Sequence, residues 1–190
     1  MKFPRLVVAG AAALGLFVST AANAAVIAVA GAPDANGTPA NTLLSSFGNN
    51  LKFTFVSKDA SFTNELTLVF GDQFIFTNAV AAGTTVVASG PASGAEILLK
   101  ILNPIGQEWF SGAASNNSDG FVHALITPLG GGVFRVAFED RSIPGRPGSG
   151  EPDYNDFVFD IQEVPVPGAA LLLLSGIAGL GFAARRKAAA

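Results

Sequence analysis

The sequence contains no cysteine and only one histidine. Without cysteine it has no disulfide framework, thiolate metal site, iron–sulfur cluster or cysteine nucleophile, and a single histidine excludes a histidine-rich metal site. Charged residues make up only 13% of the chain, against roughly 25% in typical soluble domains, whereas hydrophobic residues reach 49%. We therefore expect part of the apolar content to lie in targeting or membrane segments. The 190 residues suffice for one ordinary domain plus such segments.

The few charged side chains are unevenly distributed along the chain. All 14 acidic residues lie between Asp34 and Glu163, whereas five of the 11 basic residues lie close to the termini. The segment 25–163 therefore has six basic against 14 acidic residues, a net charge of −8. Such an acidic surface repels nucleic acid and anionic lipid and attracts cations, so we expect no nucleic-acid partner.

The first 24 residues have the pattern of a secretory signal peptide. Lys2 and Arg5 form a short basic start, and a 13-residue apolar run extends from Leu6 to Val18. This run is shorter than the roughly 20 residues that a spanning helix needs, and Ala22-Asn23-Ala24 is the kind of small-residue site that signal peptidase accepts. We expect an N-terminal signal helix, export through the Sec machinery and cleavage after Ala24. An uncleaved anchor helix is the alternative.

The C-terminal segment 164–190 has three parts: a proline motif, an apolar run over 169–184 in which Ser175 is the only polar side chain, and a basic end. In a helix that rises about 1.5 Å per residue, 16 to 19 residues reach roughly 24 to 28 Å, enough to cross a thin hydrocarbon core. Basic residues directly after a transmembrane helix favour a cytoplasmic C-terminus, which leaves the domain outside. The motif consists of Val164, Pro165, Val166, Pro167 and Gly168, and the basic end of Arg185, Arg186 and Lys187.

This three-part tail resembles the PEP-CTERM protein-sorting domain of Gram-negative bacteria. Val164 to Gly168 takes the place of Pro-Glu-Pro, and the leucine run 171–174 and Gly179-Leu180-Gly181 match the pattern of proteobacterial versions. The resemblance implies cleavage near the proline motif by an exosortase, an integral membrane transpeptidase-like enzyme. The precursor would be anchored in the inner membrane and the product delivered to the cell surface or extracellular polysaccharide. A permanent single-pass anchor is the alternative.

Between these ends, residues 25–163 have the pattern of an all-β domain. Apolar and polar residues alternate with period two, and turn residues separate the alternating runs at short intervals. This pattern favours an antiparallel β-sandwich or jelly-roll-like domain of about nine strands. Residues 31–50 are predicted to form a surface loop with one short helical turn near 43–47. The nine expected strands lie at 26–29, 51–56, 66–70, 74–76, 84–88, 96–101, 121–126, 133–139 and 156–161.

Acidic residues gather on both sides of the loop 141–152, and if the flanking strands pair as a hairpin their oxygens converge. Ca²⁺ takes six to eight oxygen ligands, and closely packed carboxylates repel one another without a cation. We therefore interpret this group as a candidate calcium site. Its residues are Glu139, Asp140, Asp153, Asn155 and Asp156.

A metal-free interpretation of the same residues stays open. Asp and Asn side chains cap turns by accepting backbone N–H groups, and Arg141 and Arg146 lie in the same loop to neutralise the acids. Residues 116–120 also have two interpretations: they form a turn, or they supply one more calcium ligand. An EF-hand is excluded because glycine at loop position six and glutamate at position twelve are not at the required spacing.

The segment 96–162 resembles a secreted bacterial domain of unknown function with a Phe-Glu-Asp element followed by Asp-Tyr-Asn-Asp. The resemblance implies a β-rich extracellular module with no established catalytic activity, in which the matching acids are candidate calcium ligands. The matching residues are Trp109-Phe110, 116–120, His123, Phe138-Glu139-Asp140 and 153–159.

A catalytic set is missing from these motifs. His123 alternates with apolar residues, as in a sheet histidine bonded to a nearby acid, and Trp109 and Phe110 are expected in the core. We expect a non-enzymatic structural or adhesive protein of the cell surface or extracellular matrix, with polysaccharide or other surface components as partners. The alternatives are a calcium-dependent carbohydrate or protein binding module and, less favoured, a surface glycosidase using Glu139 and Asp153.

Overall fold

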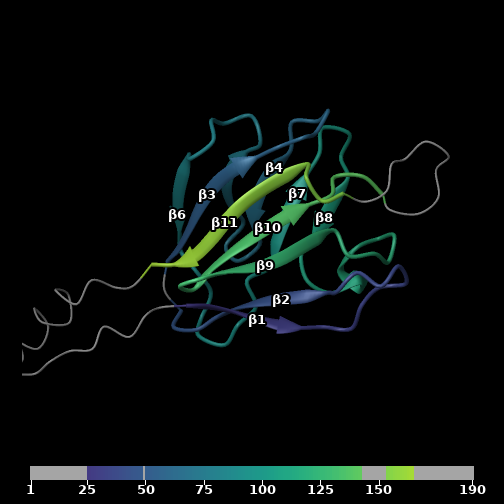
Figure 1. Ribbon diagram of the computed structural model, residues 1–190. Helices are drawn as coiled ribbons and strands as arrows, with labels where there is room; N and C mark the ends of the chain where they lie inside the picture. The colour runs from purple at the N-terminus through teal and green to yellow at the C-terminus, as the bar shows by residue number, and fades with distance from the viewer. Residues whose placement is uncertain (1–24, 49, 143–152, 165–190) are drawn as a thin grey trace, which may run out of the picture.

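The computed structural model describes residues 25–48, 50–142 and 153–164 (Figure 1). The expected signal peptide with its cleavage site at Ala24, the motif from Pro165 to Gly168, the apolar run 169–184 and the basic end 185–187 lie outside these residues. Among the residues that are described, no helix is both long and apolar enough to cross a membrane.

The described chain is all-β, as predicted, and every strand pair is antiparallel. It has eleven strands rather than about nine, together with one 3₁₀ turn. The elements are β1 (Val26–Ala30), β2 (Asn41–Ser45), β3 (Leu51–Ser57), β4 (Glu65–Leu68), β5 (Gln73–Thr77), β6 (Thr85–Ala88), β7 (Leu99–Leu102), β8 (Glu108–Phe110), η1 (Ala114–Asn116), β9 (Ala124–Gly130), β10 (Val133–Phe138) and β11 (Phe157–Glu163).

Two of these strands, β2 and β8, were not expected from the sequence. The prediction of a loop with a helical turn near 43–47 is wrong, because the segment pairs with β1 and buries Leu43 and Ser45 at alternate positions. The residues Asn41–Ser45 do not alternate strictly between polar and apolar, because Leu43 and Leu44 are adjacent, and the glycine- and proline-rich segment 31–40 precedes them. Strand β8 has only three residues, too few for a period-two signal.

The strands form three sheets. Five strands make one sheet in the order β6-β3-β11-β10-β9, four make another in the order β5-β4-β7-β8, and β1 pairs with β2. The two larger sheets share one core, because Phe76 of β5 lies 5.9 Å from Phe157 and 6.3 Å from Phe159 of β11 between ring centroids. Burial of these aromatic rings is a major source of stability for the domain.

The chain enters and leaves the domain at the same end. Val26 of β1 is paired with Ser45 of β2, and the Ser45 hydroxyl donates to the Glu163 carboxylate at the end of β11 over 2.5 Å. The other end of β11 begins at Phe157, and seven strand residues at about 3.3 Å each separate the two ends by roughly 20 Å. Residues 139–142 and 153–156 are therefore at the end of β11 remote from the chain entry and exit (Figure 1).

Candidate calcium site

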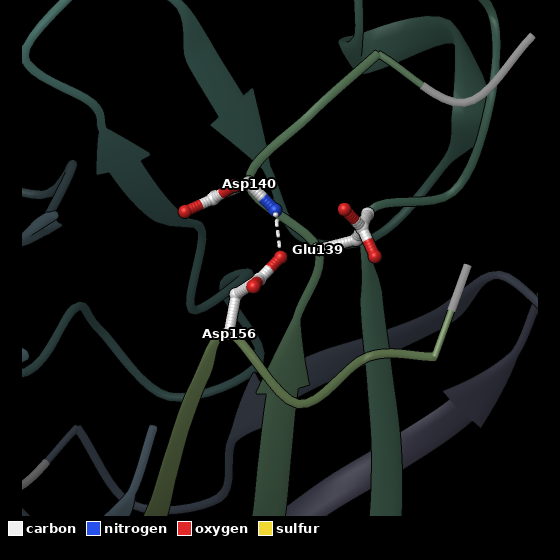
Figure 2. A group of neighbouring side chains, drawn as sticks. All are labelled: Glu139, Asp140 and Asp156. Carbon is white, nitrogen blue, oxygen red and sulfur yellow. Dashed lines mark hydrogen bonds between the residues drawn. The ribbon is translucent and has the colours of Figure 1, made fainter. Parts of the chain in front are cut away.

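The expected hairpin pairing of the acidic segments is confirmed. Phe138, the last residue of β10, is paired with Phe157, the first of β11, and the Asp156 amide donates to the Phe138 carbonyl over 3.2 Å. Glu139 and Asp140 therefore leave one strand where Asp156 enters the next. One carboxylate oxygen from each of these three residues lies within 4.8 Å of the others (Figure 2).

Tyr154 sets the course of the chain before β11. It has a left-handed backbone with φ of 50°, which costs energy in a bulky residue and has to be compensated by contacts. Its buried hydroxyl donates to the Val122 carbonyl over 2.8 Å, and the Asn155 carbonyl next to it accepts the Asp59 amide. These contacts fix the segment that holds Asp156.

Asp140 is the best-connected residue of the cluster and is 1% exposed. Its amide donates to Asp156 Oδ2 over 2.9 Å, and its Oδ2 accepts the Asn64 carboxamide over 2.6 Å. The Asp140 carbonyl accepts both Trp109 Nε1, at 2.8 Å, and Asn103 Nδ2, at 3.1 Å. The position of Asp140 is thus determined by residues of both larger sheets and their loops.

The cluster shifts the pKa of two of its members upward. Burial raises the pKa of Glu139 to about 8, and the charge and hydrogen bonding of Asp156, followed by the charges of Asp153 and Asp140, add to the shift. Burial also raises the pKa of Asp140, against the opposing hydrogen bond from Asn64 and with the charge of Asp156 adding to it. Among the described residues, these buried acids therefore lack enough positive charge to offset the shifts.

Arg141 supplies only part of that charge. Its Nε lies 4.0 Å from Asp140 Oδ1, the side chain is 54% exposed, and the guanidinium lies over the Phe62 ring, 5.5 Å from its centroid. The pKa of Asp140 stays raised although the charge of Arg141 lowers it. Arg146, the other arginine expected to neutralise the acids, lies outside the described residues.

Two buried amide oxygens beside these acids have no hydrogen-bond partner in the part of the chain that the structure describes. They are Oδ1 of Asn155, next to Asp156 in the chain, and Oδ1 of Asn64, whose Nδ2 holds Asp140. Asn155 Nδ2 donates to the exposed Asp153 over 2.8 Å. A buried carbonyl oxygen without a donor is costly, and it is also a ligand that Ca²⁺ accepts.

The neighbouring turn 116–120 has a structural role. The Asn117 carboxamide, in a residue only 5% exposed, accepts the Phe110 amide and donates to the carbonyls of Phe110 and Phe121. Asp119 Oδ2 lies 2.9 Å from Nε2 of the buried His123, so the predicted bond between His123 and an acid is confirmed. His123 precedes β9, and its Nδ1 faces the Glu139 carbonyl at 3.0 Å.

Trp109 and Phe110 differ from each other in burial. Trp109 is buried in the core, as predicted, whereas Phe110 is only half-buried. Adjacent strand residues point to opposite faces, so only one of the pair can face the core.

Three buried asparagines around the cluster were not expected from the sequence. Asn78 Oδ1 accepts the Asn64 amide, its Nδ2 donates to the carbonyls of Phe62 and Asp156, and Asn103 donates to the Asp140 carbonyl. Asn64 is separated from Asp140 by 76 positions, so no local motif could have identified the pair.

A scan against protein-family models and searches of curated proteins and solved structures find no match to the chain.

Proposed function

We propose that this chain is an exported structural or adhesive module of the cell surface, with a jelly-roll-like β-sandwich that Ca²⁺ stabilises at one end. The observation that supports calcium is the convergence of Glu139, Asp140 and Asp156 within 4.8 Å, together with buried amide oxygens for which the described residues supply no donor. A divalent cation at these carboxylates would offset both the cost of burying their charges and the repulsion between them.

The coordination would come from two sequence segments. Glu139, Asp140 and Asp156 offer carboxylate oxygens, and Asn155 offers its Oδ1, which has no partner among the described residues. Asp153, an exposed residue bonded to Asn155, and water would bring the number of oxygens to the six or more that Ca²⁺ prefers. Asn64 would act indirectly, because its amide orients Asp140.

The proposal of export and sorting rests on the two ends of the sequence. The signal-peptide pattern over 1–24 and the PEP-CTERM-like tail over 164–190 would direct the chain through Sec and signal peptidase, and then to an exosortase. Val26 and Glu163 lie at the same end of the domain, remote from the acidic cluster. A precursor held at its tail would therefore present the cluster away from the membrane.

A calcium-dependent binding module for carbohydrate or protein is the second candidate. It is favoured by the position of the cluster at a loop end, where a bound cation could also receive a ligand hydroxyl or carboxylate. Extracellular polysaccharide is the partner that the proposed location would supply. The two candidates differ in one respect: the second needs a coordination position open to the partner.

Calcium binding is tested by melting the full chain with millimolar Ca²⁺ and with chelator. Saturation at about 100 times Kd adds roughly 2.7 kcal/mol to the free energy of unfolding, which corresponds to a rise in Tm on the order of 10 °C. Asp156→Ala should abolish this rise. Glu65→Gln, which removes one exposed negative charge on β4, is the matched control and should leave it unchanged.

Equal melting temperatures in Ca²⁺ and in chelator would contradict the calcium proposal. A rise that Asp156→Ala retains would place the ion elsewhere. Mg²⁺ at the same concentration separates specific binding from general screening, because its smaller octahedral shell suits this flexible set of oxygens less well.

Export is tested by intact mass and cell fractionation, with and without the exosortase. We expect an extracellular species that begins at Ala25 and ends within 165–168. A species that retains 169–190 in the inner membrane would instead identify a tethered periplasmic module and contradict release to the matrix.

A further inference from the structure

The end of the domain at which the chain enters and leaves exposes large apolar side chains. Phe47 is 51% exposed, and its amide donates to Glu163 Oε1 over 3.3 Å at the end of β11. Leu129 is 48% exposed next to the β9–β10 turn, which lies at the same end because Val133 is paired with Gln162 (Figure 1). Both side chains are therefore exposed where the C-terminal segment continues from the domain.

The other large sheet adds apolar side chains to this end through the turn after β4. Phe70 is 48% exposed, Val69 beside it is also exposed, and Gln73 Nε2 donates to the Phe70 and Ser89 carbonyls over 2.8 and 2.9 Å. Ser89 follows β6, whose last residue is paired with the first residue of β3, and that residue is paired with Glu163. The exposed apolar side chains thus extend across the end from β6 to β9, over five strands about 4.8 Å apart. We call Phe47, Val69, Phe70 and Leu129 the apolar end.

Charged side chains are few at the apolar end. Its segments contain one basic and two acidic residues, the half-buried Lys52, the exposed Asp72 and the buried Glu163, so their net charge is −1. The segment 25–163 as a whole has a net charge of −8, and the acidic cluster lies at the opposite end of the domain. The segments counted are 25–26, 46–52, 69–73, 87–95, 129–133 and 162–164.

A short stretch of chain connects the apolar end to the proposed membrane anchor. Val164, whose amide donates to the Asn50 carbonyl, precedes Ala169, the first residue of the apolar run, by five positions. Five residues of fully extended chain reach at most about 18 Å. The polar layer on each side of a hydrocarbon core is roughly 5 to 8 Å thick. An anchor inserted in the bilayer would therefore keep the apolar end at or close to the membrane surface.

We propose that the apolar end docks on the lipid bilayer of the anchored precursor, an inference that rests on the anchoring proposed above. Phe47, Phe70 and Leu129 would bury their exposed surface in the polar layer of a zwitterionic membrane, as apolar patches at membrane interfaces do. The low charge of this end permits that approach, whereas the acidic cluster stays in water. Contacts spread across the whole end would orient the domain and hold the segment 164–168 at the membrane surface.

The absence of cysteine allows a fluorescent label at one position. The full chain with Leu129→Cys, carrying an environment-sensitive fluorophore, is reconstituted in phosphatidylcholine vesicles that contain spin-labelled lipid. We expect blue-shifted emission and roughly threefold quenching by the spin-labelled lipid. Ile105→Cys is the matched control, because Ile105 is 64% exposed and its turn is bonded to the acidic end through Asn103 and the Asp140 carbonyl. Equal quenching at the two positions would overturn the docking.

Neutral substitutions distinguish docking from anchoring. Phe47→Gln combined with Phe70→Gln should remove most of the quenching at the Leu129 label, whereas Ile105→Gln should leave it unchanged. Melting curves check that these exposed substitutions preserve the fold, and flotation of the vesicles shows whether the chain is anchored.

Three results would overturn the docking. A chain that floats with the vesicles but has an unquenched Leu129 label would contradict docking while the anchor stands. A blue shift without quenching would identify a protein, such as a second copy, as the occupant of the apolar end. A chain that does not float would contradict the anchor and the docking together.

Discussion

The indole ring of Trp109 is stacked on the imidazole ring of His123, with centroids 3.9 Å apart and planes within 5° of parallel. Both residues also touch the acidic segment, since Trp109 Nε1 donates to the Asp140 carbonyl and His123 Nδ1 faces the Glu139 carbonyl. The backbone of both acids is thereby held by one aromatic pair. Trp109 is the only tryptophan in the chain.

Trp109 should therefore report on calcium at the proposed site. Binding of Ca²⁺ to the Asp140 carboxylate would shift the Asp140 carbonyl, which accepts the indole N–H of Trp109. The fluorescence emission of a buried tryptophan responds to changes in its hydrogen bond and in its stacked neighbour. We expect a saturable change in Trp109 fluorescence on titration with Ca²⁺ and its reversal by chelator. Asp156→Ala should remove the change while Glu65→Gln retains it. A thermal shift with constant emission would place the ion away from Asp140.

The raised pKa of Glu139 predicts how the stability of the metal-free protein depends on pH. Its folded value of about 8 exceeds the ordinary 4.5, so the folded state binds this proton more tightly than the unfolded chain. The resulting stability is fully present below about pH 4.5 and is lost as pH rises to about 8. In chelator, we expect Tm to fall by several degrees between about pH 6 and pH 9.

Glu139→Gln removes this titrating group and should flatten the fall. Calcium should oppose the fall as well, since it binds the deprotonated carboxylates. The measurement is a series of melting curves across this pH range for both proteins in chelator. An unchanged slope in Glu139→Gln would assign the pH dependence to other groups.

Two substitutions at Asp156 separate its structural contact from its charge. Asp156 Oδ2 accepts the Asp140 amide, and the carboxamide oxygen of asparagine can accept it equally. In chelator, Asp156→Asn should therefore be as stable as wild type or more stable, because one repelling charge is lost. Asp156→Ala leaves the Asp140 amide without its acceptor and should cost about 1 to 3 kcal/mol. Both should lose the response to Ca²⁺, and denaturant unfolding with and without the ion checks this.

The acidic cluster was predictable because its parts are close to strand ends. Strand pairing places Phe138 opposite Phe157. Glu139 and Asp140, which follow Phe138, therefore lie close to Asp156, which precedes Phe157. Asp153 and Asn155 were harder to place, since their positions depend on the left-handed turn at Tyr154, which favours glycine or asparagine rather than tyrosine.

The residues that support the cluster could not be predicted from local patterns. Asn64 and Asn103 reach Asp140 from loops that neighbour it only after the two larger sheets pack together. Strand β2 was missed for a related reason, because its pairing with β1 and with Glu96 is a tertiary contact rather than a local preference.

Asn117 takes the place of a neighbouring strand at the outer edge of β8, and its replacement should be costly. Its Oδ1 accepts the Phe110 amide at 2.7 Å, and its Nδ2 donates to the carbonyls of Phe110 and Phe121 at 3.1 and 2.9 Å. Asn117→Ala leaves these partly buried backbone groups without this partner and should lower the free energy of unfolding by roughly 1 to 3 kcal/mol.

Asn117→Asp keeps the acceptor but sets a carboxylate against both carbonyls, so we expect it to be at least as destabilising as Asn117→Ala. Urea unfolding of the two variants measures the loss. Hydrogen exchange should accelerate more at the Phe110 amide in Asn117→Ala than at the Phe53 amide of the remote β3, where only the global loss of stability acts. Wild-type stability in Asn117→Asp would mean that water or another donor satisfies the Phe110 and Phe121 carbonyls, and that the edge of β8 is not held by this side chain.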